Sequence, residues 1–182
     1  MPRARLAPLF LAASALVAAC APAARVPPQH PAAEKPIVLE TADDPLALTA
    51  VGAHFAAKGW AAEHETALAQ LVLTSPARKK YGVRAYMNGK GEIDRLVLFK
   101  GFVIKPEARG SAKLRELVAE LTNDVNGVVY QLSTDGALVC ATWVYFIDAL
   151  DPRLLQRALE LLDEVAITVV AKKAPALIDM LQ

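Results

Sequence analysis

The chain has 182 residues, of which 54% are hydrophobic and 21% are charged, and its formal net charge at pH 7 is +1. This length is enough for one domain with its own core. The balanced charge argues against a nucleic-acid partner, because nucleic-acid-binding proteins normally carry a strong basic excess.

The N-terminal segment has the pattern of an export signal. Arg3 and Arg5 supply positive charge, residues 6–16 are largely apolar, and small residues precede Cys20. Counted with the small residues up to Ala19, the apolar run of about 14 residues is shorter than the roughly 20 that a membrane-spanning helix needs. The pattern therefore favours export over a transmembrane anchor.

The junction Val17-Ala18-Ala19-Cys20 resembles a bacterial lipobox, in which an aliphatic and two small residues precede a cysteine that becomes acylated. The resemblance implies that residues 1–19 are a signal peptide and that lipidated Cys20 attaches the mature protein to a bilayer of the cell envelope. Ala21, rather than Asp, follows the cysteine, which by family analogy implies the outer membrane, facing the periplasm, in a Gram-negative cell. Secretory cleavage after residues 21–23 and a retained N-terminal helix are the alternatives.

Residues 20–42 are expected to form a tether that leads to a single folded domain over residues 43–182. Proline and alanine dominate residues 21–36, and such a composition favours extended backbone without a core. A proline-rich ligand for a partner is the alternative interpretation of this segment. Cys140 is then the one cysteine of the domain, which excludes an internal disulfide and predicts a small buried hydrophobic residue.

The folded part is predicted to begin with a helix near Asp43-Asp44-Pro45, where an acidic cap precedes proline at the first helical position. Gly59 supplies a stop signal. The next stretch, residues 61–73, fits either a short strand or a helix. The apolar stripe of the first helix consists of Leu48, Val51 and Phe55.

Two β-hairpins and a helix are predicted in the middle of the chain. Residues 83–87 and 93–104 form the first hairpin around a turn at residues 88–91. Leu114, Leu117, Val118 and Leu121 then recur at helical spacing, and Asn126-Gly127 ends the helix. Residues 128–133 and 137–147 form the second hairpin around Asp135-Gly136.

A long final helix is predicted to begin at Asp151-Pro152 and to end or kink at Pro175. Asp163-Glu164 is expected on its solvent side. Lys172 and Lys173 suit the negative end of the helix dipole. Its apolar stripe consists of Leu155, Leu159, Leu162, Val165 and Val169.

The predicted order α-β-β-β-α-β-β-α has no βαβ alternation, which indicates an α+β domain with helices on an antiparallel sheet. The stretch from Leu117 through Asn123-Asp124-Val125-Asn126 and Asp135-Gly136 to Leu154-Leu155 resembles the YbjN-type domain family. The resemblance implies the fold of type III secretion chaperones and brings no catalytic motif. The sequence departs from that family at Val125 and Gly127.

No motif for catalysis, metal binding or a cofactor is found. His30 lies in the tether, and His54 and His64 are too far apart for a helical ligand pair. Neither a G-x-S-x-G motif nor a phosphate-binding glycine loop occurs. We therefore expect no catalytic residue, no metal and no cofactor, and keep an enzyme or small-ligand site near His54 and His64 as an alternative.

The basic run Arg78-Lys79-Lys80 is the strongest charge cluster. Such a run is usually a solvated loop. The functional alternative is contact with anionic head groups beside the lipid anchor, where each basic residue contributes about 1 kcal/mol.

Two predicted strands are apolar on both faces, whereas a sheet covered on one side should alternate apolar with polar residues. Val97 and Phe99 alternate with Leu98 and Phe102, and Trp143 and Tyr145 alternate with Val144 and Phe146. Either helices or residues 61–73 cover the second face, or a homodimer or another partner does. The candidate partner-binding residues are Phe99, Phe102, Trp143 and Tyr145.

These observations predict a membrane-anchored envelope lipoprotein that acts as a non-catalytic, chaperone-like or regulatory module. Its partner would be the bilayer through acylated Cys20, together with a polypeptide or a second copy of the chain. A passive structural lipoprotein is a further alternative.

Overall fold

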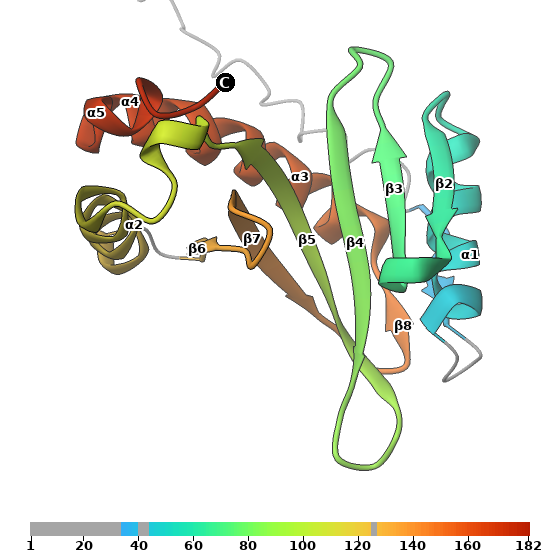
Figure 1. The fold of residues 1–182 in the computed structure, drawn as a ribbon. Coiled ribbons are helices and arrows are strands. Elements are labelled where there is room, and N and C mark those ends of the chain that lie inside the picture. The colour runs from blue at the N-terminus through green and yellow to red at the C-terminus, as the bar shows by residue number, and fades with distance from the viewer. Residues whose placement is uncertain (1–33, 40–43, 125–126) are drawn as a thin grey trace, which may run out of the picture. The chain divides into compact units, whose positions relative to one another are not determined.

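The computed structural model describes residues 34–39, 44–124 and 127–182. Within them, helices α1 (Asp44–Ala56), α2 (Ala112–Asp124) and α3 (Pro152–Glu164) accompany a six-stranded sheet (Figure 1). Every pair of neighbouring strands in that sheet is antiparallel. The α+β class predicted from the sequence is therefore confirmed.

The six strands of the main sheet do not follow chain order, because β7 lies between β5 and β6. Their order across the sheet is β2 (Ala61–Glu65), β3 (Gln70–Thr74), β4 (Lys80–Met87), β5 (Ile93–Val103), β7 (Ala137–Tyr145) and β6 (Val129–Leu132).

Residues 61–73, which fit either a strand or a helix in sequence, contain two strands. β2 and β3 pair as a hairpin, joined by a short 3-10 turn over Thr66–Leu68. The first run of strands therefore has four members where three were predicted. Ala69 closes the turn with φ of 47°, a left-handed conformation that Gly or Asn normally supplies. The hairpin was missed because its turn carries no such signal.

The predicted first helix and both predicted hairpins are confirmed. The stripe of α1 is fully buried. Asn88 caps the β4–β5 turn, where its Oδ1 accepts the amides of Lys90 and Glu92. Gly136 turns the β6–β7 hairpin with φ of 81°.

The final helix is interrupted, which corrects the prediction of one long helix. After α3 comes a π-helical turn over Val165–Val169, then α4 (Val170–Lys173) and α5 (Pro175–Ile178). The wider turn shifts the buried stripe by one position. Val170, rather than the predicted Val169, is therefore buried against the core.

The folded unit begins earlier than the predicted boundary at residue 43. β1 (Ile37–Val38) pairs with β8 (Ala149–Leu150), and Ile37 and Leu150 are both buried in the core. Residues 34–39, which were assigned to the tether, therefore belong to the domain. The predicted signal peptide, Cys20 and the motif residues Val125 and Asn126 lie outside the described residues.

Helices α1 and α3 pack on the same face of the sheet, which we call the inner face. α1 contacts β2, β3 and β4, and α3 contacts β5 and β7 (Figure 1). The two helices meet one continuous apolar surface because alternate strand residues point toward them. Its fully buried members include Leu71, Leu73, Val83, Leu96, Leu98 and Leu138.

Candidate functional site

The opposite side of the sheet, the outer face, carries aromatic and basic side chains that the described helices leave uncovered. Trp143 is 37% exposed and Tyr145 is 62% exposed. The strand register places its central residues in three rows. The rows are Gly82 with Phe99 and Ala141, Arg84 with Val97 and Trp143, and Tyr86 with Arg95 and Tyr145.

This arrangement excludes one of the explanations for the two-sided apolar pattern. α1 and α3 both lie on the inner face, and residues 61–73 extend the sheet sideways as β2 and β3. The expectation that helices or this segment cover the second face is therefore wrong. Within the described part of the chain, the outer face has no cover.

The Phe99 side chain lies flat on the backbone of the neighbouring strand. A Cβ atom placed on Gly82 would come within 2.1 Å of the Phe99 ring, so glycine is required for this contact. The Arg84 guanidinium carbon also lies over this ring, 5.3 Å from its centroid. Phe99 is therefore held in place and only half-buried.

Hydrogen bonds orient Arg84 across the outer face. Gln70 Oε1 accepts its Nε and Nη2 protons at 3.2 and 3.0 Å. Gln70 in turn donates to Glu65 Oε2 at 2.6 Å. Because the Gln70 amide is neutral, these bonds do not balance the positive charge of Arg84, which stays available to a ligand.

A second guanidinium stands beside a hollow of about 240 Å³ on the same face. Arg95 lies 5.8 Å from the centroid of the Tyr86 ring. Among the described residues, neither Arg84 nor Arg95 has a carboxylate within salt-bridge distance. The hollow is lined by Tyr86, Arg95, Val97, Val129, Gln131, Ala141 and Trp143.

Three of the four predicted partner-binding residues share the outer face. Phe99, Trp143 and Tyr145 lie there together, since alternate residues of paired strands point the same way. Phe102 does not join them, because it lies on the inner face, where Lys100 Nζ is 5.9 Å from its ring. Arg84, Arg95 and Tyr86 were missed, although their strand positions match the face of Phe99.

The residues of the basic run Arg78-Lys79-Lys80 make different contacts. All three residues are exposed, and Lys79 reaches α3, where it donates to Asp163 Oδ2 at 2.5 Å. Lys100 donates to the other oxygen of the same carboxylate at 3.0 Å. Asp163 therefore faces the sheet and not solvent, which corrects the expectation for the Asp163-Glu164 pair.

This carboxylate is charged at neutral pH in spite of its partial burial. Burial alone raises the pKa of Asp163, but hydrogen bonds from Lys79, Lys100 and Tyr81 outweigh it, and the pKa is lowered. The pKa of Tyr81 is raised by burial and by the same carboxylate. The cluster ties α3 to β4 and β5.

The two histidines of the domain lie in different surroundings. His54, in the last turn of α1, has Nε2 3.6 Å from Glu34. Burial and Lys58 lower the pKa of His54, while Glu34 opposes them. His64 lies exposed on β2. No group of three His, Cys, Asp or Glu side chains able to hold a metal occurs in the described residues.

Cys140 is fully buried on the inner face, as predicted. Burial raises the pKa of its thiol to about 11, so the nucleophilic thiolate is scarce at neutral pH.

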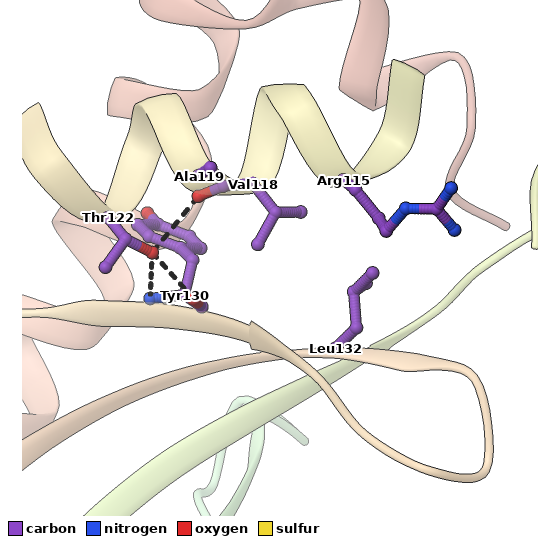
Figure 2. Close-up of a pocket in the computed structure, with 6 residues that line it drawn as sticks. All are labelled: Arg115, Val118, Ala119, Thr122, Tyr130 and Leu132. Carbon is purple, nitrogen blue, oxygen red and sulfur yellow. Dashed lines mark hydrogen bonds between the residues drawn. The ribbon is translucent and has the colours of Figure 1, made fainter. Parts of the chain in front are cut away.

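A pocket of about 350 Å³ lies between α2 and β6 (Figure 2). Thr122 Oγ1 accepts the Tyr130 amide at 3.2 Å and lies 2.6 Å from the Tyr130 carbonyl oxygen. One hydroxyl thus satisfies backbone groups on the outer edge of β6. Arg115 and Leu132 line the opposite end of the pocket.

Comparison with known proteins adds no assignment. No protein-family model, curated protein or solved structure matches the chain. In the described part of the chain, no helix has both the length and the apolar character to cross a membrane.

Proposed function

We propose that this chain is a lipid-anchored, non-catalytic binding protein of the bacterial cell envelope that holds an acidic polypeptide segment on its outer face. The observation that carries this proposal is the uncovered row of aromatic side chains interleaved with Arg84 and Arg95. Trp, Tyr and Arg are the residues that most often dominate binding energy at protein interfaces. A chaperone-like role, and the likeness to YbjN-type domains, belong to the same proposal.

The charge of the partner follows from the two guanidinium groups. Each guanidinium lies over an aromatic ring, so its N–H groups point outward from the ring edge toward a ligand. In Arg84 the Nε and Nη2 groups already donate to Gln70, so a carboxylate would be met on the Nη1 side. The aromatic rings supply apolar contact at a low cost in side-chain entropy. An acidic segment with apolar residues is therefore the partner chemistry that fits.

The proposed location at a membrane of the cell envelope depends on acylation of Cys20. Acylation of a lipobox cysteine adds more than one chain and gives firmer attachment than a single chain would. The full chain should fractionate with membranes, and Cys20→Ser should move it to the soluble fraction. An unmodified Cys20 in mass spectrometry would contradict this part of the proposal.

Binding is tested with the full chain in mild detergent and a fluorescein-labelled decapeptide of alternating Val and Glu. A peptide of alternating Val and Lys is the charge control. We expect the Glu peptide to bind about tenfold or more tightly than the Lys peptide, and Trp143→Asp or Arg95→Glu to weaken it about tenfold. Leu68→Asp changes a residue that is 50% exposed elsewhere and should leave binding unchanged.

Two results would overturn the proposal. The first is equal binding of both peptides, or binding that is insensitive to Trp143→Asp. The second is a dimer in sedimentation velocity that Trp143→Asp dissociates, because a second copy would then occupy the face.

A further inference from the structure

The two long sides of β7 are used unevenly. Along one side, β5 pairs with all residues from Ala137 to Tyr145. Along the other side, β6 pairs only with residues 138–141. In the described part of the chain, residues 142–145 therefore have a strand neighbour on one side alone.

The direction of the backbone groups shows which of them lack a partner. Ser133 N–H donates to the Ala137 carbonyl oxygen at 2.9 Å, so Ala137 faces β6. Phe146 N–H donates to the Asp94 carbonyl oxygen at 3.1 Å, so Phe146 faces β5. Along a strand, the backbone N–H and C=O groups of successive residues point alternately toward the two sides of the strand. Those of Trp143 and Tyr145 therefore point away from β5.

This open edge differs from the outer edge of β6 nearby. There Thr122 bonds the backbone of Tyr130, and α2 stands against the strand (Figure 2). Proteins commonly protect sheet edges in such ways, because an unpaired edge is a template for another strand. Among the described residues, Trp143 and Tyr145 have no such cap.

A pocket of about 440 Å³ separates the open edge from α3. Leu154, 45% exposed, and Leu161 form an apolar wall opposite the strand. Arg157 also lines the pocket, and no described carboxylate is within salt-bridge distance of it. The groove thus has backbone hydrogen-bonding groups on one side, apolar side chains on the other and a positive charge.

We propose that this groove takes up an extended segment of the polypeptide partner as an added strand beside β7, in line with β6. Its backbone would bond to Trp143 and Tyr145, and an acidic side chain would meet Arg157. Alternate side chains would contact the outer-face rings and the Leu154–Leu161 wall. This inference rests on the proposed function and specifies how the partner binds.

The first test removes one backbone donor and compares two variants that both lack the tyrosine ring. Tyr145→Pro has no N–H, whereas Tyr145→Val keeps it. Because the Tyr145 N–H makes no bond to β5, proline is tolerated there better than at a paired position. With the Val–Glu decapeptide and the full chain in detergent, we expect Tyr145→Pro to bind about tenfold more weakly than Tyr145→Val. Equal affinity of the two folded variants would overturn the inference.

The second test needs no variant, and it decides the matter if Tyr145→Pro fails to fold. Amide hydrogen exchange measured by NMR should be fast at Trp143 and Tyr145 in the free chain and slow at Thr142 and Val144. The decapeptide should slow exchange at Trp143 and Tyr145 about tenfold or more. Unchanged exchange with peptide bound would overturn strand addition.

The outcomes separate this inference from the proposed function. Binding that responds to Trp143→Asp without new protection at Trp143 and Tyr145 overturns strand addition and leaves the proposed function standing. A complete lack of peptide binding overturns both. Protection that rises with protein concentration alone, together with a dimer in sedimentation, would show that β7 pairs with a second copy and would overturn the inference.

Discussion

The inner and outer faces of β5 carry comparable apolar sequence but meet different surroundings. Leu96 and Leu98 point inward and are fully buried, whereas Val97 and Phe99 point outward and are half-buried. The inner face relies on leucines that α1 and α3 cover. The outer face combines aromatic rings with guanidinium groups, a composition typical of interfaces. In this domain, residue type therefore distinguishes the face that the helices cover from the face that the described residues leave uncovered.

The largest expected effect comes from shortening an inner-face residue. Leu98→Ala should lower the free energy of unfolding by about 3 kcal/mol, because it removes buried methyl groups and leaves a cavity. Val97→Ala, its neighbour on the outer face, should cost less than about 1 kcal/mol. Urea unfolding followed by circular dichroism measures both. Equal losses would show that the outer face is covered in solution.

Local signals predicted most of this fold. α1 has a buried stripe at helical spacing, and the turns at Asn88 and Gly136 carry residues that favour tight turns. The β2–β3 hairpin escaped because Ala69 adopts a left-handed conformation without a turn signal. The π-helical turn after α3 was also not predicted, since it depends on the packing of α4 against the core.

The Asp163 cluster gives the next largest effect and depends on pH. The pKa of Asp163 is lowered in the folded state. Its carboxylate therefore stabilises the fold fully above the unfolded pKa of about 3.9, and this stabilisation is lost as the pH falls through the folded pKa. Asp163→Asn should lower the free energy of unfolding by about 2 kcal/mol at pH 7. The difference in stability between the variant and the parent chain should become smaller below about pH 4. Melting temperatures between pH 3 and pH 7 measure it.

The neighbouring carboxylate supplies a control for that experiment. Glu164→Gln removes an exposed carboxylate and should change the melting temperature little at any pH. A gap for Asp163→Asn that stays constant with pH would contradict the role of the charged carboxylate.

The candidate site could be predicted only in part. Phe99, Trp143 and Tyr145 were found because strand alternation places them on one face. Arg84 and Arg95 were missed, because cross-strand register decides that they stand over Phe99 and Tyr86. Asp163 was misplaced because its partners, Lys79 and Lys100, are distant in sequence.

The capped edge of β6 should show a smaller effect. Thr122→Val keeps the side-chain shape but leaves the Tyr130 amide without its partner, at a cost of about 1 kcal/mol. Thr122→Ser retains the hydroxyl and should cost less. Thermal unfolding compares the two, and sedimentation velocity tests whether the uncapped edge associates. Equal stability of the Val and Ser variants would show that the hydroxyl does not protect this edge.

The smallest effect is expected at the outer face itself. Tyr145→Ala should change the free energy of unfolding by less than about 0.5 kcal/mol, because its side chain is 62% exposed and packs on little of the domain. The same variant should weaken binding of the Val–Glu decapeptide, since the ring is part of the proposed contact surface. A residue that matters for binding but not for folding is what an uncovered, partner-binding face requires. A large loss of stability would instead assign Tyr145 to the core and remove the contrast between the two faces.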